Sequence, residues 1–510
     1  MELFVDILVV AVIVGYTLAL GFIFLYSLTQ AHLLLRYLFY KKQYKTRQQP
    51  TSLFSELPFV TVQLPVYNEK YVAERLIGCV AKLDYPNDKF EIQVLDDSTD
   101  ETFEIIANIV AQLKSVVNIR HIHRPVRTGF KAGALKEGLQ KANGELIAIF
   151  DADFLPAKDF LRKTVPHFID KNIGMVQTRW AWLNKSYSIL TRVQAFALDA
   201  HFSIEQVGRN IAGGFINFNG TAGVWRKECI EDAGNWQADT LTEDLDLSYR
   251  AQLKNWKFIY LEEVGAPSEL PPVMSAVKTQ QYRWNKGGGE TARKHLAKVI
   301  RSNKPLHVKW HGMMHLLTSG VFICVFIFSV FSLPMLWIHK HYPEHANMFT
   351  LGDIFFTGFF VLVGLFFASV AIREKNKWKA VALFFKNFPS FLSLSMGLSL
   401  HNAIAVFEGY CGHKTPFIRT PKFNVISQTD QWTGNTYMRR KLNKLTIAEA
   451  LLSIYFMFGI YLSFRLSNFS LLPFHVLLAI GYAAVVYFSI FHQAIKPVKS
   501  KLVVENREAA

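Results

Sequence analysis

The sequence of 510 residues predicts an α/β domain with a parallel sheet, inserted between membrane-spanning helices. Hydrophobic residues make up 51% of the chain, with 43 phenylalanines among them, and they gather in a few long runs. Between residues 58 and 310 the apolar runs are short, and strand-like segments alternate with helical ones. That alternation is typical of parallel sheets, because a helix is the usual connection between two parallel strands.

The first apolar run, Ile7 to Tyr26, has no charge over 20 residues and is long enough to cross a bilayer as a helix. A signal peptide begins with basic residues, whereas Glu2 and Asp6 precede this run, so we expect a retained anchor. Four further runs are candidate spans: His311–Ile338, Ile354–Ile372, Leu445–Phe464 and Leu471–Phe491.

The net charge of +16 does not indicate nucleic-acid binding, because the basic residues follow the spans. Positive charge beside a span marks the cytoplasmic side of a membrane. We therefore expect a multi-pass membrane protein, of the inner membrane if bacterial, with the globular domain and the C-terminus in the cytoplasm. The basic residues concerned are Arg36, Lys41, Lys42, Lys45 and Arg47 after the first run, and Lys496, Lys499 and Lys501 after the last.

The apolar segment Trp378–Glu408 is expected to lie at the membrane interface or to re-enter the membrane from one side. If it crossed, the basic segment 414–444 would lie outside, and Lys386 and Pro389 would lie within a span. The resulting division is a first span (1–40), a cytosolic domain with interfacial helices (41–310), two spans (311–374), an interfacial helix with a basic loop (375–444), two spans (445–492) and a cytosolic tail (493–510).

Four scattered cysteines show neither metal-ligand spacing nor a disulfide pattern.

The segment Glu145–Asp153 is an apolar strand that ends in two carboxylates, Asp151 and Asp153. In open α/β sheets the ligand lies beyond the carboxyl ends of the strands. Paired carboxylates are typical ligands of Mg²⁺ or Mn²⁺, usually with phosphate oxygens completing the coordination. The pattern therefore predicts a metal site, and the alternative is an acidic loop after a core strand.

Two earlier strands also end in acidic residues. Phe59–Leu64 leads to Tyr67 and Glu69, and Glu91–Leu95 leads to Asp96 and Asp97. Carboxylates accept hydrogen bonds from the base and ribose of a nucleotide. Each strand end alone is explained by loop polarity, but three such ends meeting at one sheet edge indicate a nucleotide site.

The turn before the helix at 134–141 carries Arg127 and Lys131 among glycines. These cations suit a diphosphate, and glycine lets the backbone approach a ligand closely. The spacing is not that of a Walker motif, so the turn alone is weak support for phosphate binding.

The second half of the domain contains two further patterns. Thr242-Glu243-Asp244 is explained either by a helix N-cap with acidic residues in the first turn, or by a role in a functional site. Gln280, Arg283 and Trp284 share one helix face, where Arg grips a diphosphate and Trp offers a flat surface to a sugar. The alternative for the latter is an interfacial helix with Trp and Arg at the headgroups.

Taken in order, these motifs resemble those of the processive family 2 glycosyltransferases, that is, cellulose synthase and the cellulose-synthase-like glucan and mannan synthases. The resemblance covers roughly 58–284 and rests on Asp, Asp-x-Asp, Thr-Glu-Asp and Gln-x-x-Arg-Trp between spans. It implies a GT-A (Rossmann-like) fold and transfer from a nucleotide sugar with inversion at the anomeric carbon. Phe423–Ser427 is also similar to the family's gating loop, although Ile426 and Gln428 replace its Thr and Lys.

The resemblance implies a role for each matching residue. Asp244 is the expected catalytic base, and Asp151 and Asp153 are expected to hold the donor diphosphate through Mg²⁺ or Mn²⁺. The expected donor-binding residues are Tyr67, Glu69, Asp96, Asp97, Arg127, Lys131, Asp151 and Arg283. The expected acceptor-binding residues are Phe218, Asn219, Gly220, Thr221, Glu243, Gln280 and Trp284.

The expected activity is polymerisation of a β-linked, glucan-like polysaccharide, extruded through the enzyme's own bundle in the bilayer. UDP-glucose is the first expected donor and GDP-mannose the second; an accessory export subunit is left open, and no nucleic-acid partner is expected. A rival is a lipid glycosyltransferase, such as one similar to ceramide glucosyltransferase, because the catalytic pattern is shared. A second rival is a transporter or scaffold whose α/β domain only senses a nucleotide sugar.

Overall fold

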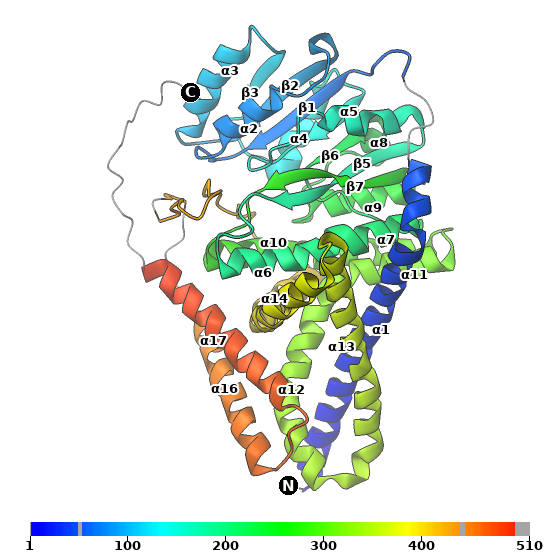
Figure 1. Cartoon of the computed structure of the whole chain (residues 1–510), viewed down its shortest axis with the longest axis vertical. Coiled ribbons are helices and arrows are strands. Elements are labelled where there is room, and N and C mark those ends of the chain that lie inside the picture. The colour runs from blue at the N-terminus through cyan, green and yellow to red at the C-terminus, as the bar shows by residue number, and fades with distance from the viewer. Residues whose placement is uncertain (1, 49–53, 434, 438–443, 495–510) are drawn as a thin grey trace.

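The structure is a computed structural model, and it describes residues 2–48, 54–433, 435–437 and 444–494. An α/β domain lies at one end of a long helical bundle (Figure 1). Helices α6, α7, α10 and α11 lie between the sheet and the bundle, and α1 runs from the far end of the bundle up to the domain (Figure 1). The basic residues Lys496, Lys499 and Lys501, and nearly all of the tail expected at 493–510, lie outside the described residues.

The sheet has seven strands in the order β3-β2-β1-β4-β6-β5-β7. The first four strands, which lie in the segment 59–153, are parallel, and this confirms the expectation for that segment. Strand β6, later in the chain, runs antiparallel to both β4 and β5, so the sheet as a whole is mixed. The strands are β1 Val60–Val66, β2 Phe90–Asp96, β3 Ile119–His123, β4 Leu146–Ile149, β5 Ile173–Trp182, β6 Gly223–Arg226 and β7 Lys257–Ser268.

Strand β4 shows why the run after Glu145 is continuously apolar. Leu146 and Ala148 belong to the hydrophobic core on one face of the sheet, and Ile147 and Ile149 belong to the core on the other. Because neighbouring residues of a strand point to opposite faces, a strand buried on both faces must be apolar throughout. This double burial holds the strand's carboxyl end, and Asp151 beyond it, in a fixed position.

Helices cover both faces of the sheet and connect its strands. They are α2 Ala73–Val80, α3 Thr102–Leu113, α4 Phe130–Gln140, α5 Phe160–Thr164, α6 Ile189–Ala200, α7 Gln206–Ile211, α8 Lys227–Asp232, α9 Glu243–Leu253 and α10 Met274–Arg301. The strands and helices expected in 59–153 are present, with bounds that differ by a few residues. Helix α10 confirms the helical face expected for Gln280, Arg283 and Trp284.

Five helices of the described chain are long and apolar enough to cross a membrane. They are α1 Glu2–Gln48, α12 Val321–His341, α13 Ala346–Arg373, α16 Leu445–Arg465 and α17 Leu472–Ala494. The expected span His311–Ile338 begins too early, because α11 (Leu306–Leu316) ends before the apolar segment that starts at Thr318. Which end of each helix faces the cytoplasm stays a prediction.

The segment expected at the interface forms two helices, α14 Lys377–Gly397 and α15 Ser399–Cys411, with a 51° bend between them. A bend of this size fits either a broken span or a re-entrant pair. Helix α15 packs along α10, so the pair also supports the helix that carries Arg283 and Trp284.

Candidate active site

A cavity of about 140 Å³ lies at the carboxyl ends of β1, β2 and β4. Helix α10 and the segment 417–422 also line it. Its position is the one expected for a ligand of an open α/β sheet. Most of the residues expected from the sequence line it: Tyr67, Glu69, Asp97, Arg127, Lys131, Asp151, Asp153, Asn219, Gly220, Glu243, Asp244, Gln280, Arg283 and Trp284.

Asp151 and Asp153 follow β4 and are each paired with a lysine. Asp151 Oδ1 lies 2.6 Å from Lys131 Nζ, and Asp153 Oδ2 lies 2.8 Å from Lys422 Nζ. The other oxygen of Asp153, Oδ1, is buried and has no hydrogen-bond partner among the described residues. A buried acceptor without a partner is costly, so this oxygen fits a cation that the chain itself does not supply. The two carboxylates therefore fit a divalent metal such as Mg²⁺ or Mn²⁺.

Lys131 connects Asp151 to the loop before β6. Its ammonium donates to the carbonyl oxygen of Gly220 at 2.8 Å and lies 3.9 Å from Glu243 Oε1. Burial alone would lower the pKa of Lys131, but the charges of Asp151 and Glu243 outweigh it and raise that pKa. Lys131 is therefore cationic in the cavity, where it can help to neutralise a diphosphate.

Asp244 lies in the first turn of α9 and lines the same cavity as the Asp-x-Asp residues. Burial raises the pKa of Asp244 to about 7, and the charge of Glu243 adds to the shift. Gly220 has φ +80°, and a Cβ there would lie 3.0 Å from Asp244 Oδ2. A glycine at this position thus permits the left-handed turn and the close approach of the loop to Asp244. A carboxyl that titrates near neutrality is suited to act as a general base.

Asp97 and Arg127 form a second part of the cavity wall. Arg124 holds the Asp97 carboxylate in a bidentate pair at 2.6 and 2.7 Å. The guanidinium of Arg127 lies 3.7 Å from the same carboxylate and 3.5 Å from the ring centroid of Tyr67, on which it is stacked. The flat Arg–Tyr pair and a fixed carboxylate suit a nucleoside.

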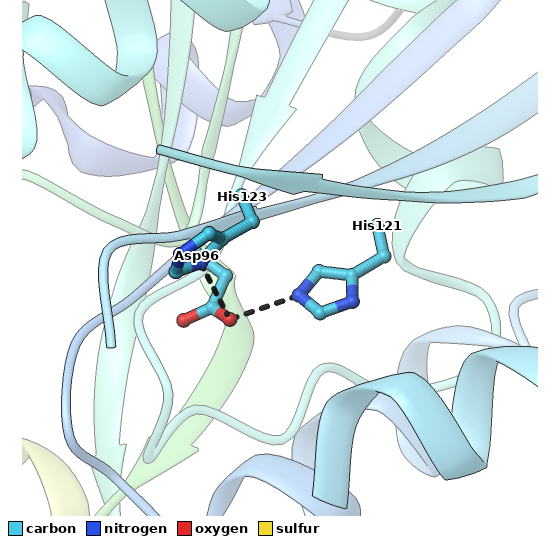
Figure 2. Close-up of side chains that lie close together, drawn as sticks. All are labelled: Asp96, His121 and His123. Atoms are coloured by element: carbon cyan, nitrogen blue, oxygen red, sulfur yellow. Dashed lines mark hydrogen bonds and ion pairs between the residues drawn. The ribbon is translucent and has the colours of Figure 1, made fainter. Parts of the chain in front are cut away.

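Asp96 does not line the cavity, in contrast to Asp97. Figure 2 shows its carboxylate directed at two imidazoles of β3: His121 Nε2 lies 2.8 Å and His123 Nδ1 lies 3.5 Å from Asp96 Oδ2. Consecutive residues at a strand end point to opposite sides, so only one of the two aspartates can face the ligand. Asp96, His121 and His123 have the composition of a metal site, with ligand atoms within 4.8 Å of one another, and they also satisfy one another as hydrogen-bonding partners.

Two expected acceptor residues lie behind the cavity wall. Phe218 is fully buried and packs against Trp225 and Trp236. Thr221 is also fully buried, and its hydroxyl accepts a hydrogen bond from the Asp151 backbone N–H at 2.8 Å. Neither side chain lines the cavity, and both support its wall from behind. Their expected contact with the acceptor stays a prediction.

The segment 417–422 places residues at the cavity for which the sequence predicted no role. Arg419 pairs with Glu69 at 2.8 Å, and Lys422 pairs with Asp153. Phe417 lies under the guanidinium of Arg283, with 4.9 Å between that group and the ring centroid. The segment adds two cations and an aromatic ring to the cavity, and its basic composition was the only signal in the sequence.

The gating-like sequence that follows is docked on the domain. The backbone N–H groups of Phe423 and Asn424 both donate to Glu269, each at 2.9 Å. Burial raises the pKa of Glu269 to about 7, and the charge of Asp153 adds to the shift. Phe423 and Val425 are buried against the start of α10. The gating role stays a prediction; the segment is joined to the cavity through Glu269, which lines it.

Comparison with known proteins identifies the class of the domain. Residues 58–287 match the family model described as "Glycosyltransferase like family 2". The chain therefore carries a family 2 glycosyltransferase domain, and its mixed α/β sheet is a GT-A fold.

Two proteins similar to this chain are plant enzymes. The chain is 40% identical over 303 residues to glucomannan 4-beta-mannosyltransferase 1 of Oryza sativa, covering 56% of this chain and 58% of that protein. It is 41% identical over 275 residues to glucomannan 4-beta-mannosyltransferase 2 of Arabidopsis thaliana, covering 53% and 51%. The matches thus span little more than half of each relative's length.

Among solved structures, a mannosyltransferase of Pyrobaculum calidifontis in complex with GDP-Man and Mn²⁺ is 21% identical, with a TM-score of 0.47. The match covers 72% of this chain and 99% of that one.

Proposed function

We propose that the protein is a membrane-bound mannosyltransferase that transfers mannose from GDP-mannose to the end of a growing β-linked glycan. The observation that carries this proposal is the cavity that combines Asp244, with its raised pKa, and the Asp151–Asp153 pair. A base and a diphosphate site in one cavity are what an inverting sugar transfer requires.

The relatives favour one of the two expected donors. Several relatives are named as glucomannan 4-beta-mannosyltransferases, and this favours mannosyl over glucosyl transfer. GDP-mannose, the second donor expected from the sequence, therefore replaces UDP-glucose as the proposed donor.

In the proposed reaction the Asp244 carboxylate removes the proton from an acceptor hydroxyl. The hydroxyl oxygen forms a bond to C1 of mannose while the bond from C1 to the diphosphate oxygen breaks. Attack from the face opposite the leaving group inverts the anomeric carbon. Arg283, Lys131 and Lys422 lie around the cavity and would stabilise the negative charge on the departing diphosphate.

Asp151 and Asp153 would hold the divalent cation. When bound, such a cation supplies Lewis-acid stabilisation of the leaving diphosphate. Tyr67, Asp97 and Arg127 would hold the nucleoside, with the Arg127–Tyr67 stack offering a flat surface to the base. Gln280, Trp284 and Asn219 remain the proposed acceptor contacts.

The five candidate spans support a polymer that leaves through the bundle, with the catalytic domain in the cytoplasm. A lipid acceptor is the second candidate, because the Asp-x-Asp and Gln-x-x-Arg-Trp residues do not distinguish the two. The route through the bundle and any accessory export subunit belong to this proposal.

The test uses detergent-purified full-length protein with GDP-mannose, GDP-glucose and UDP-glucose, each with Mn²⁺, Mg²⁺ or chelator. Nucleoside diphosphate release is measured, and the product is sized before and after β-mannanase digestion. We expect metal-dependent GDP release from GDP-mannose and a mannanase-sensitive chain. A single mannose on an organic-soluble lipid would overturn the polymer proposal. Turnover of UDP-glucose alone would contradict GDP-mannose as the donor. Tight binding of a donor without turnover would favour a transporter or scaffold that only senses a nucleotide sugar.

A further inference from the structure

Three tryptophans form one wall of the catalytic cavity. Trp180 and Trp182 are at the end of β5, and Trp284 is on α10. The ring of Trp180 lies between the other two, with its centroid 6.4 Å from that of Trp182 and 6.4 Å from that of Trp284. All three are only half-buried, so each presents part of its ring to the cavity. The row begins at Trp284, the residue proposed to contact the acceptor, and continues through Trp180 to Trp182.

The two β5 rings are held rigidly from behind. Trp180 is stacked on Phe202 at 5.0 Å and meets the edge of Phe154 at 5.2 Å. The indole N–H of Trp182 donates to Asp199 Oδ1 at 2.7 Å. Rings that are fixed before a ligand arrives lose little conformational entropy on binding, which favours them as a binding surface.

The far end of the row is connected to the membrane helices. Asp199, which holds Trp182, also pairs with Lys185 at 2.8 Å and with Arg373. Arg373 is the last residue of α13, at one end of that candidate span. Leu198 of α6 lines the cavity beside the row, and α6 packs against α13 and α14. The row therefore leads from the catalytic residues towards α6 and the end of α13.

We propose that Trp180 and Trp182 form acceptor subsites for the second and third sugar rings of the growing chain. This inference rests on the proposed function and adds the route by which the acceptor enters the cavity. A β-linked pyranose exposes an apolar face of C–H groups, and that face is complementary to an indole ring. The chain would run from Trp284 along Trp180 and Trp182, and reach the bundle beside α6.

The experiment varies acceptor length. Purified full-length protein receives saturating GDP-mannose and Mn²⁺ with mannose oligomers from the disaccharide to the hexasaccharide, and KM is measured for each. In the wild type we expect KM to fall as each of the first three rings is added. Trp180→Leu should remove the gain from the second ring and Trp182→Leu the gain from the third, each raising KM for long acceptors roughly threefold to tenfold.

Two variants control for structural damage. The indole N–H of Trp180 has no hydrogen-bond partner among the described residues, so Trp180→Phe removes ring area without breaking a hydrogen bond. It should restore part of the gain that Trp180→Leu loses. Trp256, half-buried outside this cavity, is the matched control, and Trp256→Leu should keep the wild-type dependence on acceptor length.

The KM for GDP-mannose separates the proposal from a general distortion of the site. It should stay at the wild-type value in both leucine variants. An unchanged dependence on acceptor length, or an equal loss with every acceptor together with a raised KM for GDP-mannose, would overturn the proposal.

A binding measurement separates this inference from the proposed function. Calorimetric titration of mannohexaose and cellohexaose into the protein with GDP and Mn²⁺ needs no turnover. Weaker binding of either hexasaccharide by Trp180→Leu would support the subsites even if GDP-mannose is not the donor. Equal affinity of wild type and variant for both would overturn them.

Discussion

The ammonium of Lys131 lies 2.6 Å from Asp151 Oδ1 and donates to the carbonyl of Gly220 at 2.8 Å. It thereby joins the carboxyl end of β4 to the loop that approaches Asp244. A diphosphate held through a cation on Asp151 would lie close to Lys131. In the proposed reaction the lysine therefore connects the donor side of the cavity with the acceptor side. The first three predictions concern the groups around this contact.

Asp244→Asn should lower kcat by roughly 10²–10⁴, because the amide cannot take the acceptor proton. The affinity for GDP, measured by calorimetry, should stay close to wild type, since the proposed partner of Asp244 is the acceptor and not the donor. Asp232→Asn, on the exposed end of α8, is the control and should keep full turnover. Near wild-type kcat in Asp244→Asn would exclude this residue as the base.

The pH dependence of kcat/KM should show an acid limb with a pKa of about 7. Burial, with the charge of Glu243, raises the pKa of Asp244 to about 7, and only the deprotonated carboxylate can act as the base. Activity should therefore fall as the pH drops below that value and level off above it. The residual activity of Asp244→Asn should lack this limb. A limb near the ordinary pKa of an aspartate would contradict the assignment.

Asp153→Asn should raise the Mn²⁺ concentration needed for half-maximal activity. The substitution removes a negative charge and replaces one oxygen of the Asp153 carboxylate by an amide nitrogen, which cannot bind the metal. The measurement is a Mn²⁺ titration of GDP release at saturating donor. Asp159→Asn, six residues further on at the start of α5, should leave the titration unchanged. The same half-activating concentration in both variants would place the metal elsewhere.

Asp246→Asn should destabilise the protein by about 3–5 kcal/mol, because it breaks a buried ion-pair cluster. The Asp246 carboxylate is fully buried and accepts from His295 and Lys294, each at 2.7 Å, and from Arg250 at 2.8 Å. Thermal unfolding in detergent measures the loss. Asp239→Asn is the matched control: its half-exposed carboxylate also pairs with Lys294, and its loss should cost about 1 kcal/mol or less. Equal melting temperatures for the two variants would contradict the importance of the cluster.

Lys278 and Glu449 should show strong coupling in a double-mutant cycle. The two are 2.6 Å apart and nearly fully buried, and they join α10 to the candidate span α16. Lys278→Met or Glu449→Leu alone leaves a buried charge unpaired and should lower stability by about 3–5 kcal/mol. The double variant Lys278→Met/Glu449→Leu should recover most of that loss. Additive losses in thermal unfolding would show that the pair does not act as a unit.

Much of this architecture could be predicted because it depends on local patterns. The continuous apolar run of β4 follows from burial on both faces, and the three-and-four spacing of Gln280, Arg283 and Trp284 places them on one face of α10. The five apolar helices follow from the length of uncharged sequence. In each case the residues that carry the signal are neighbours along the chain.

Other features depend on contacts between distant segments, and no local pattern reports them. Asp96 and Asp97 are adjacent carboxylates at the end of a strand buried on both faces, so the sequence does not indicate which one faces the ligand. Strand β6 has only four residues, and its direction is decided by hydrogen bonds to β4 and β5.

By itself the sequence determined the α/β domain, the apolar helices and most of the residue types in the cavity, because these follow from periodicity and spacing. Only the tertiary structure decided that Lys422 meets Asp153, that Thr221 supports Asp151 from behind, and that Trp180 and Trp182 extend the row from Trp284. The reason is physical: side chains from separate elements meet only when the sheet and α10 pack together, and packing is a property of the whole chain.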